Sequence, residues 1–195
     1  MRFRKADRDE TKAAAGYAFG AGLTYASDNR DGLLSPPEMI FPGLSGGRWA
    51  DVMSGRVGLA GRDDMLAVNA TLLGPGRVRN RVTVVLASGL LPVADAIPVA
   101  QEPIGDPESA GEPLCLPMDL AGLYRASGVP TSTVLLAGPV LTLMRARPDL
   151  AWSTAGGNLT VWDDGTRPVT DLPARLALVR AVLLVGLPGA FRERG

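Results

Sequence analysis

The sequence predicts one α+β domain over residues 1–195, with an antiparallel sheet of about five strands and an N-terminal and a C-terminal helix packed on it. Three observations predict this class. The chain has 195 residues, which suffices for one hydrophobic core. Strand-like segments follow one another across short turns between residues 48 and 90, which is typical of an antiparallel meander. Helical patterns stand near both ends of the chain.

The first helix is expected over residues 7–21. Acidic residues lie in its first turn, where the helix dipole stabilises negative charge, and Gly20 or Gly22 is suited to end it. A short strand is expected at 23–25. Prolines and glycines then predict a loop over residues 33–47.

The main sheet is expected from three segments, at residues 49–57, 64–73 and 78–86. The turns between them are indicated by Gly-Arg-Asp at 61–63 and by Gly-Pro-Gly at 74–76. The third segment alternates polar and apolar side chains, so its two faces differ in character. These three strands should pair as an antiparallel meander.

The stretch 92–118 contains six prolines among acidic and small residues. This composition predicts a long Pro-rich acidic loop. Loops of this length are uncommon in compact domains and often carry function. The loop could pair with basic residues of its own chain or of a second copy.

The C-terminal part is expected to hold a short helix at 139–147, a hairpin of residues 150–153 and 158–163, and a last helix that begins near Asp171. Trp152 and Trp162 flank the hairpin and should pack on the core. Paired acids at 63–64 and 163–164 lie in turns, where carboxylates usually face solvent.

Composition excludes several kinds of chemistry. The chain has no histidine, and Cys115 is its single cysteine, so it offers no His ligand, no intrachain disulfide and no multi-thiolate zinc site. We expect no cofactor, and we interpret Cys115 as a small buried apolar residue. Twenty basic and twenty acidic residues balance, which argues against a nucleic-acid partner.

No apolar run is long enough for integral membrane insertion, and the charged N-terminus lacks a signal-peptide core. We therefore expect a cytoplasmic bacterial protein. Only Lys5 and Lys12 of the twenty basic residues are lysine, which indicates a GC-rich genome.

A resemblance rests on the segments 19–25 (FGAGLTY), 52–56 (VMSGR) and 81–86 (RVTVVL), followed by the hairpin from Trp152 to Trp162 and a final apolar helix. Together they resemble uncharacterised actinobacterial proteins in which a soluble α+β domain often follows transmembrane helices. The resemblance implies the fold class, and it implies no activity and no site residue.

The candidate binding site is a strip of Arg77, Arg79 and Arg81. Alternate residues of a strand project from one face, so three guanidinium groups could bind phosphates or a carboxylate-rich partner. The alternative is a solvated face whose arginines pair with acids such as Asp63 and Asp64.

Two motifs with known chemistry are incomplete. Residues 43–47 have the Gly-x-Ser-x-Gly spelling of a nucleophile elbow, but Ser45 has neither the strand–helix context nor a histidine. Residues 27–38 match a calcium loop in part, with Asn29 and Asp31 as ligands, but two prolines obstruct the exiting helix. We interpret both as loops.

The leading hypothesis is therefore a non-catalytic interaction or accessory protein that binds a protein partner or itself. The rival hypothesis is a small-molecule or anion-binding domain that uses the arginine strip. A third is a peripheral membrane protein that uses the basic N-terminal residues around Phe3.

Overall fold

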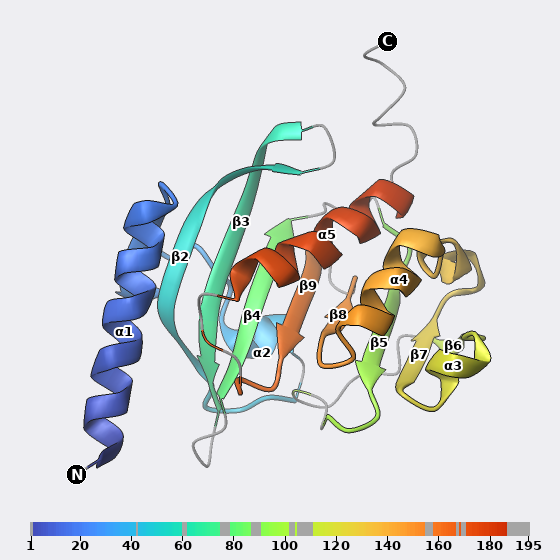
Figure 1. The fold of residues 1–195 in the computed structure, drawn as a ribbon, viewed down its shortest axis with the longest axis horizontal. Helices are drawn as coiled ribbons and strands as arrows, with labels where there is room; N and C mark the ends of the chain where they lie inside the picture. Colours follow the sequence, from blue (N-terminus) through green and yellow to red (C-terminus); the bar gives the residue numbers. More distant parts are fainter. Residues whose placement is uncertain are drawn as a thin grey trace.

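The computed structural model describes residues 2–41, 43–59, 62–74, 79–86, 91–101, 104, 111–154, 158–166, 168 and 171–186. A large antiparallel sheet forms the centre, with helices packed against it (Figure 1). The α+β class predicted from the sequence is confirmed. Among the described residues, no helix is both long and apolar enough to cross a membrane.

The sheet has nine described strands, so the prediction of about five was wrong. They run in the order β1-β2-β3-β4-β9-β8-β5-β7-β6, and all neighbouring pairs are antiparallel. Their bounds are β1 Thr24–Asp28, β2 Arg48–Leu59, β3 Arg62–Leu73, β4 Arg79–Leu86, β5 Ala94–Pro98, β6 Glu112–Pro113, β7 Tyr124–Gly128, β8 Ala151–Ser153 and β9 Asn158–Asp163.

The expected meander is formed by β2, β3 and β4, and the expected hairpin by β8 and β9. β9 pairs with β4 and thereby joins the two halves of the sheet. The helices are α1 Arg2–Gly20, α2 Pro37–Ile40, α3 Met118–Ala121, α4 Gly138–Ala146 and α5 Leu172–Gly186, with a 3-10 helix at Pro130–Leu135.

The Pro-rich stretch 92–118 is not one loop, which corrects the sequence-based expectation. It contains β5, β6 and the start of α3. Its prolines fit this structure because Pro98 is the last residue of β5 and Pro113 lies in the edge strand β6, where a missing N–H is tolerated. All five residues of β5 are buried.

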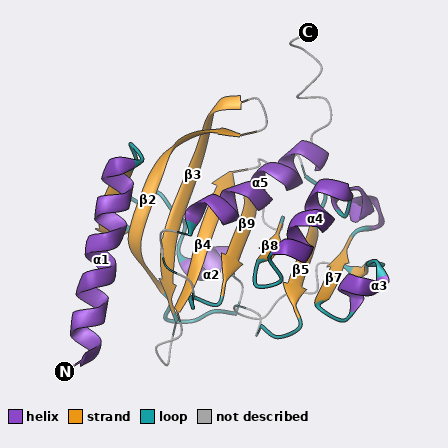
Figure 2. Cartoon of the chain, in the orientation of Figure 1, coloured by secondary structure: helices purple, strands orange, loops and turns teal. Residues whose placement is uncertain are grey.

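Two apolar layers enclose the sheet. α4 and α5 cover one face and pack on Trp152, Leu159 and Val161, as Figure 2 shows for the two helices. On the opposite face the segment around α2 packs with Trp49 and Trp162. Both predicted tryptophans of the hairpin are thus core residues, 0% and 3% exposed.

α1 lies on the same side of the sheet as α5, over β1 and β2 at the edge (Figure 1). Its contact is narrow, because Ala14 and Ala18 meet Met53 of β2. The helix ends where the Leu23 N–H donates to the Ala18 carbonyl at 2.8 Å and Gly22 takes the left-handed conformation with φ 68°. Between α1 and α5 the sheet carries polar side chains.

Candidate functional site

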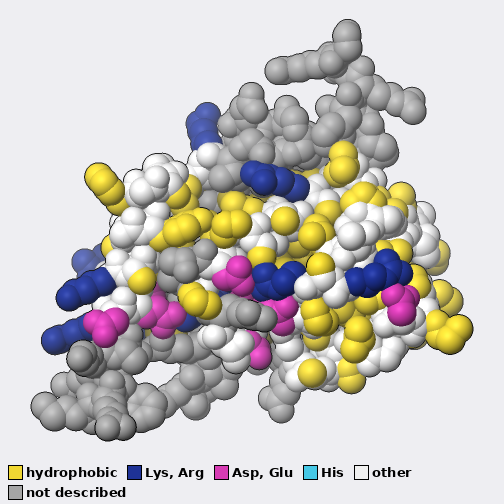
Figure 3. All heavy atoms as spheres, viewed as in Figure 1, with side chains coloured by type: hydrophobic (Ala, Val, Ile, Leu, Met, Phe, Trp, Pro, Cys, Tyr) yellow, Lys and Arg dark blue, Asp and Glu magenta, His cyan; other side chains and the backbone are white. Residues whose placement is uncertain are grey.

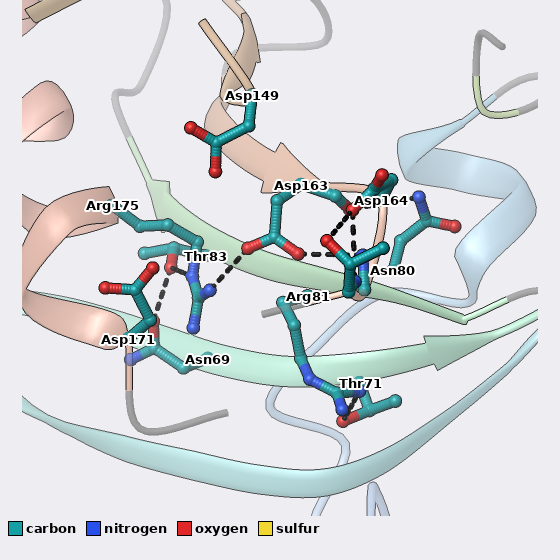
Figure 4. Close-up of polar contacts among 12 residues, drawn as sticks. Asn69, Thr71, Asn80, Arg81, Thr83, Asp149, Asp163, Asp164, Asp171 and Arg175 are labelled. Atoms are coloured by element: carbon teal, nitrogen blue, oxygen red, sulfur yellow. Dashed lines mark hydrogen bonds and ion pairs between the residues drawn. The ribbon is translucent and has the colours of Figure 1, made fainter. Parts of the chain in front are cut away.

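A buried polar network lies on the α5 side of the sheet (Figure 4). We define it as six side chains that are at most 2% exposed: Asn69 and Thr71 of β3, Arg81 and Thr83 of β4, Asp163 of β9 and Arg175 of α5. Strand register places them together, because Arg81 pairs with Thr71 on one side and Asp163 on the other. Asn69 pairs with Thr83 one step along the same face.

Arg175 and Asp163 form the centre of the buried polar network. Arg175 Nη1 donates to Asp163 Oδ2 at 2.7 Å, and Arg175 Nε donates to Thr83 Oγ1 at 3.2 Å. Thr83 Oγ1 in turn donates to Asn69 Oδ1 at 2.5 Å. The other carboxylate oxygen of Asp163 accepts the Gly165 N–H at 2.8 Å. These bonds hold the N-terminal part of α5 on the sheet.

Arg81 connects the network to α1. Its Nη1 donates to Thr71 Oγ1 at 3.1 Å, and its Nη2 binds the Glu10 carboxylate of α1. Figure 4 shows the Arg81 guanidinium pointing toward Thr71 and away from Asp163. Its Nε, also buried, has no hydrogen-bond partner within the described part of the chain.

The network belongs to a longer row of alternating charges. Arg147 Nη2 binds Asp149 Oδ2 at 2.7 Å and Asp171 Oδ2 at 2.9 Å, and Asp171 acts electrostatically on Arg175. From α1 toward α4 the order is Glu10, Arg81, Asp163, Arg175, Asp171, Arg147, Asp149. Acidic and basic side chains cross the middle of this face in Figure 3. The row ties both terminal helices to the sheet.

The pKa values of the network are set first by burial. Desolvation lowers the pKa of Arg81 and raises the pKa of Asp163, while their opposite charges act in the other direction. The 2.7 Å bond between Asp163 and Arg175 is short and charge-assisted, so both groups are held as an ion pair. An ion pair of this kind is suited to holding α5 on the sheet and is poorly suited to proton transfer.

The structure describes the three arginines of the predicted strip to different extents. Arg81 is 2% exposed and bonded inside the protein, so it lies on no solvated face. Arg79 pairs through its backbone with Leu73, and its side chain lies outside the described part. Arg77 lies outside the described residues. A joint role of Arg77 and Arg79 with Arg81 stays a prediction.

Sequence reasoning missed most of the network. Asp163 was interpreted as a solvent-facing turn residue, and this was wrong because it is fully buried against Arg175. The available signal was the occurrence of polar residues at alternate positions, Asn69 and Thr71 in one strand and Arg81 and Thr83 in the next, each pair next to apolar residues.

The remaining sequence motifs have simple structural roles. Asn29 closes its turn by accepting the Leu34 N–H at 3.0 Å and donating to the Leu34 carbonyl at 2.7 Å. Cys115 is exposed, so its interpretation as a buried residue was wrong. In the described part no three acids or thiols are grouped as metal ligands. Ser45 is exposed.

A second buried carboxylate, Asp95 of β5, lies on the opposite face of the sheet. It is 7% exposed and accepts a hydrogen bond from Ser127 Oγ of β7 at 2.6 Å. Burial raises the pKa of Asp95, and the Ser127 bond and the Arg125 charge oppose that effect. The ionised carboxylate therefore costs folding free energy.

We expect Asp95→Asn to stabilise the protein at neutral pH. The folded pKa of Asp95 is raised above its unfolded value, so the cost of ionisation is fully present above the folded pKa and disappears as the pH falls through it. The advantage of Asp95→Asn should shrink in the same interval. Urea unfolding from neutral pH to about pH 4 measures the difference.

The exposed aspartate Asp31 provides the matched control. Asp31→Asn removes the same charge without changing a buried site and should leave the pH dependence of unfolding close to that of the wild type. A lower stability of Asp95→Asn at neutral pH would contradict the assigned cost.

Comparisons with known proteins show the fold alone. No protein-family model matches the sequence, and no curated protein matches it significantly. Among solved structures, the chain is similar to the mycobacterial trehalose monomycolate transport factor A, TtfA, with a TM-score of 0.63. The match covers 91% of this chain and 96% of that chain at 13% identity. The same arrangement of elements thus occurs in TtfA.

Proposed function

We propose that this chain is a non-catalytic interaction or accessory protein, and that a second copy of the chain is the first partner to test. The observation that carries the proposal is a group of exposed apolar side chains near α3. Val99, Met118 and Leu123, here called the α3 corner, are 51%, 93% and 47% exposed. Grouped exposed apolar side chains are typical of interaction sites.

The α3 corner is held in place by the sheet. Val99 and Leu123 extend the β5–β7 pairing beyond Pro98 and Tyr124, and the Val99 N–H donates to the Leu123 carbonyl at 2.8 Å. The backbone of Val99 and Leu123 is therefore fixed by the sheet, and a backbone that is ordered before binding lowers the entropy cost of binding. Figure 3 shows hydrophobic side chains toward the side of the molecule where α3 and α4 lie.

The likeness to TtfA supports an accessory role by analogy of fold. TtfA is described as a transport factor for trehalose monomycolate. The buried and half-buried charges of the present chain add to this support, because the row from Glu10 to Asp149 connects the helices to the sheet.

Light scattering after size-exclusion chromatography tests self-association. We expect the mass to rise with concentration, and the double variant Met118→Asp/Leu123→Asp to abolish the rise. Phe19→Asp is the matched control, because Phe19 is 89% exposed at the end of α1. Its mass should follow that of the wild type.

A wild-type monomer at every concentration would overturn self-association. Crosslinking in extracts of the native host then tests a different protein partner. A partner captured by the wild type and by Phe19→Asp, but lost with the double variant, would support the proposal. A partner that the wild type and the double variant capture equally well would contradict the proposal.

A further inference from the structure

α1 rests on the sheet along a narrow strip. Glu10, Ala14 and Ala18 recur every four residues and so lie on one face of the helix. Ala14 and Ala18 are fully buried, whereas Asp9, Lys12 and other residues of the opposite face are exposed. The partly buried Tyr17 of α1 packs against the same cluster, but the two alanine methyl groups at its centre bury little apolar area and stabilise the docked helix only weakly.

Beneath this strip lies the guanidinium group of Arg81, which, among the described residues, has a free hydrogen-bond donor on the edge that faces α1. Nε and Nη2 of an arginine form one edge that matches the two oxygens of a carboxylate or a phosphate. In Arg81, Nη2 binds Glu10 and Nε has no partner within the described part of the chain. Thr71 holds Nη1 at 3.1 Å and thereby fixes the plane of the group.

The backbone beside Arg81 carries a local irregularity. Asp51 has a positive φ of 49°, and the β2–β3 register shifts between Ala50 and Met53, which marks a β-bulge. Tyr25 Oη donates to Asp51 Oδ1 at 2.9 Å. Bulges and strained residues are common next to binding sites.

We propose that the Nε–Nη2 edge of Arg81 is a binding site for an oxyanion and that α1 is the lid of this site. Glu10 occupies the edge through Nη2 in the closed state, and a carboxylate or phosphate group of a ligand replaces it with two parallel hydrogen bonds. Ligand binding and docking of Glu10 exclude each other, so the ligand weakens the attachment of α1. Asp163 acts electrostatically on Arg81 as well, but its Oδ2 is bound to Arg175 and not to the Nε–Nη2 edge.

Nitrogen-15 NMR of the arginine Nε–H groups tests the site directly. The Arg81 signal is assigned by its loss in Arg81→Lys, and the full-length chain is titrated with inorganic phosphate and, separately, with acetate. The variant Glu10→Gln removes the carboxylate that competes with the added anion for Arg81. We expect the Arg81 signal to shift saturably, with a Kd about tenfold lower in Glu10→Gln than in the wild type. The anion with the lower Kd identifies the preferred oxyanion.

Asp9→Asn is the matched control, because Asp9 is the exposed neighbour of Glu10 on α1. It should titrate like the wild type. Amide hydrogen exchange supplies an independent readout: saturating anion should speed exchange in α1 and leave α5 unchanged. An equal response of Asp9→Asn and Glu10→Gln, or a shift reproduced by chloride at the same ionic strength, would overturn the site. Tight binding with unchanged exchange in α1 would overturn the lid.

Discussion

Asp163→Ala should lower the free energy of unfolding by about 3–5 kcal/mol, one of the two largest losses expected in this chain. The substitution leaves the Arg175 guanidinium, 1% exposed, without its carboxylate in the core. It also removes the acceptor of the Gly165 N–H. Urea unfolding followed by tryptophan fluorescence measures the loss.

Asp164→Ala is the control, because Asp164 is the exposed neighbour and bonds only to Thr166 in the described part. Its cost should stay below about 1 kcal/mol. The double variant Asp163→Leu/Arg175→Met removes both charges, and it should be more stable than Asp163→Ala. If Asp163→Ala fails to fold, Asp163→Asn gives the same ranking from a milder change. Equal losses for Asp163→Ala and Asp164→Ala would refute the assigned role.

Trp152→Ala should cost about 3–5 kcal/mol for a different reason. Trp152 of β8 is fully buried in the layer beneath α4 and α5, so truncation leaves a large cavity there. Trp152 Nε1 has no hydrogen-bond partner among the described residues, so its N–H adds nothing to stability. Trp152→Phe should therefore cost clearly less than Trp152→Ala. Thermal and urea unfolding of both variants check this order.

Phe19→Ala is the corresponding exposed control, since 89% of Phe19 is accessible to solvent. It should change the unfolding free energy by less than about 0.5 kcal/mol. A loss in Trp152→Phe as large as that in Trp152→Ala would contradict the expected order of the two variants.

Local pattern predicted the central part of the fold well. β2, β3 and β4 were recognisable because their turns are marked by glycine and because β4 alternates in polarity. β5 and β7 were missed for a physical reason. β5 is five residues long, contains an aspartate and ends in proline, and its stability comes from neighbours on both sides. Burial between two neighbouring strands is a tertiary effect, and the strand propensities of single residues do not predict it.

The candidate site was predictable only in part. The sequence placed Arg81 on a strand face, and the structure shows that face to be covered by α1 and α5. Its acidic contact comes from the N-terminal helix, and the arginine that binds Asp163 comes from the C-terminal helix. No local pattern indicates which distant helix covers a strand, so the buried ion pairs could not be found from sequence.

The position of β9 between β4 and β8 affects how the chain folds during its synthesis. During synthesis β2, β3 and β4 emerge early and can pair at once, but the free edge of β4 meets its partner only after residues 158–163 have left the ribosome. Until then the nascent chain exposes unpaired N–H and C=O groups beside apolar side chains, which favours intermolecular association. Pairing between segments so distant in sequence also slows folding. Recombinant yield should therefore depend on translation rate and chaperone supply more strongly than equilibrium stability alone would suggest.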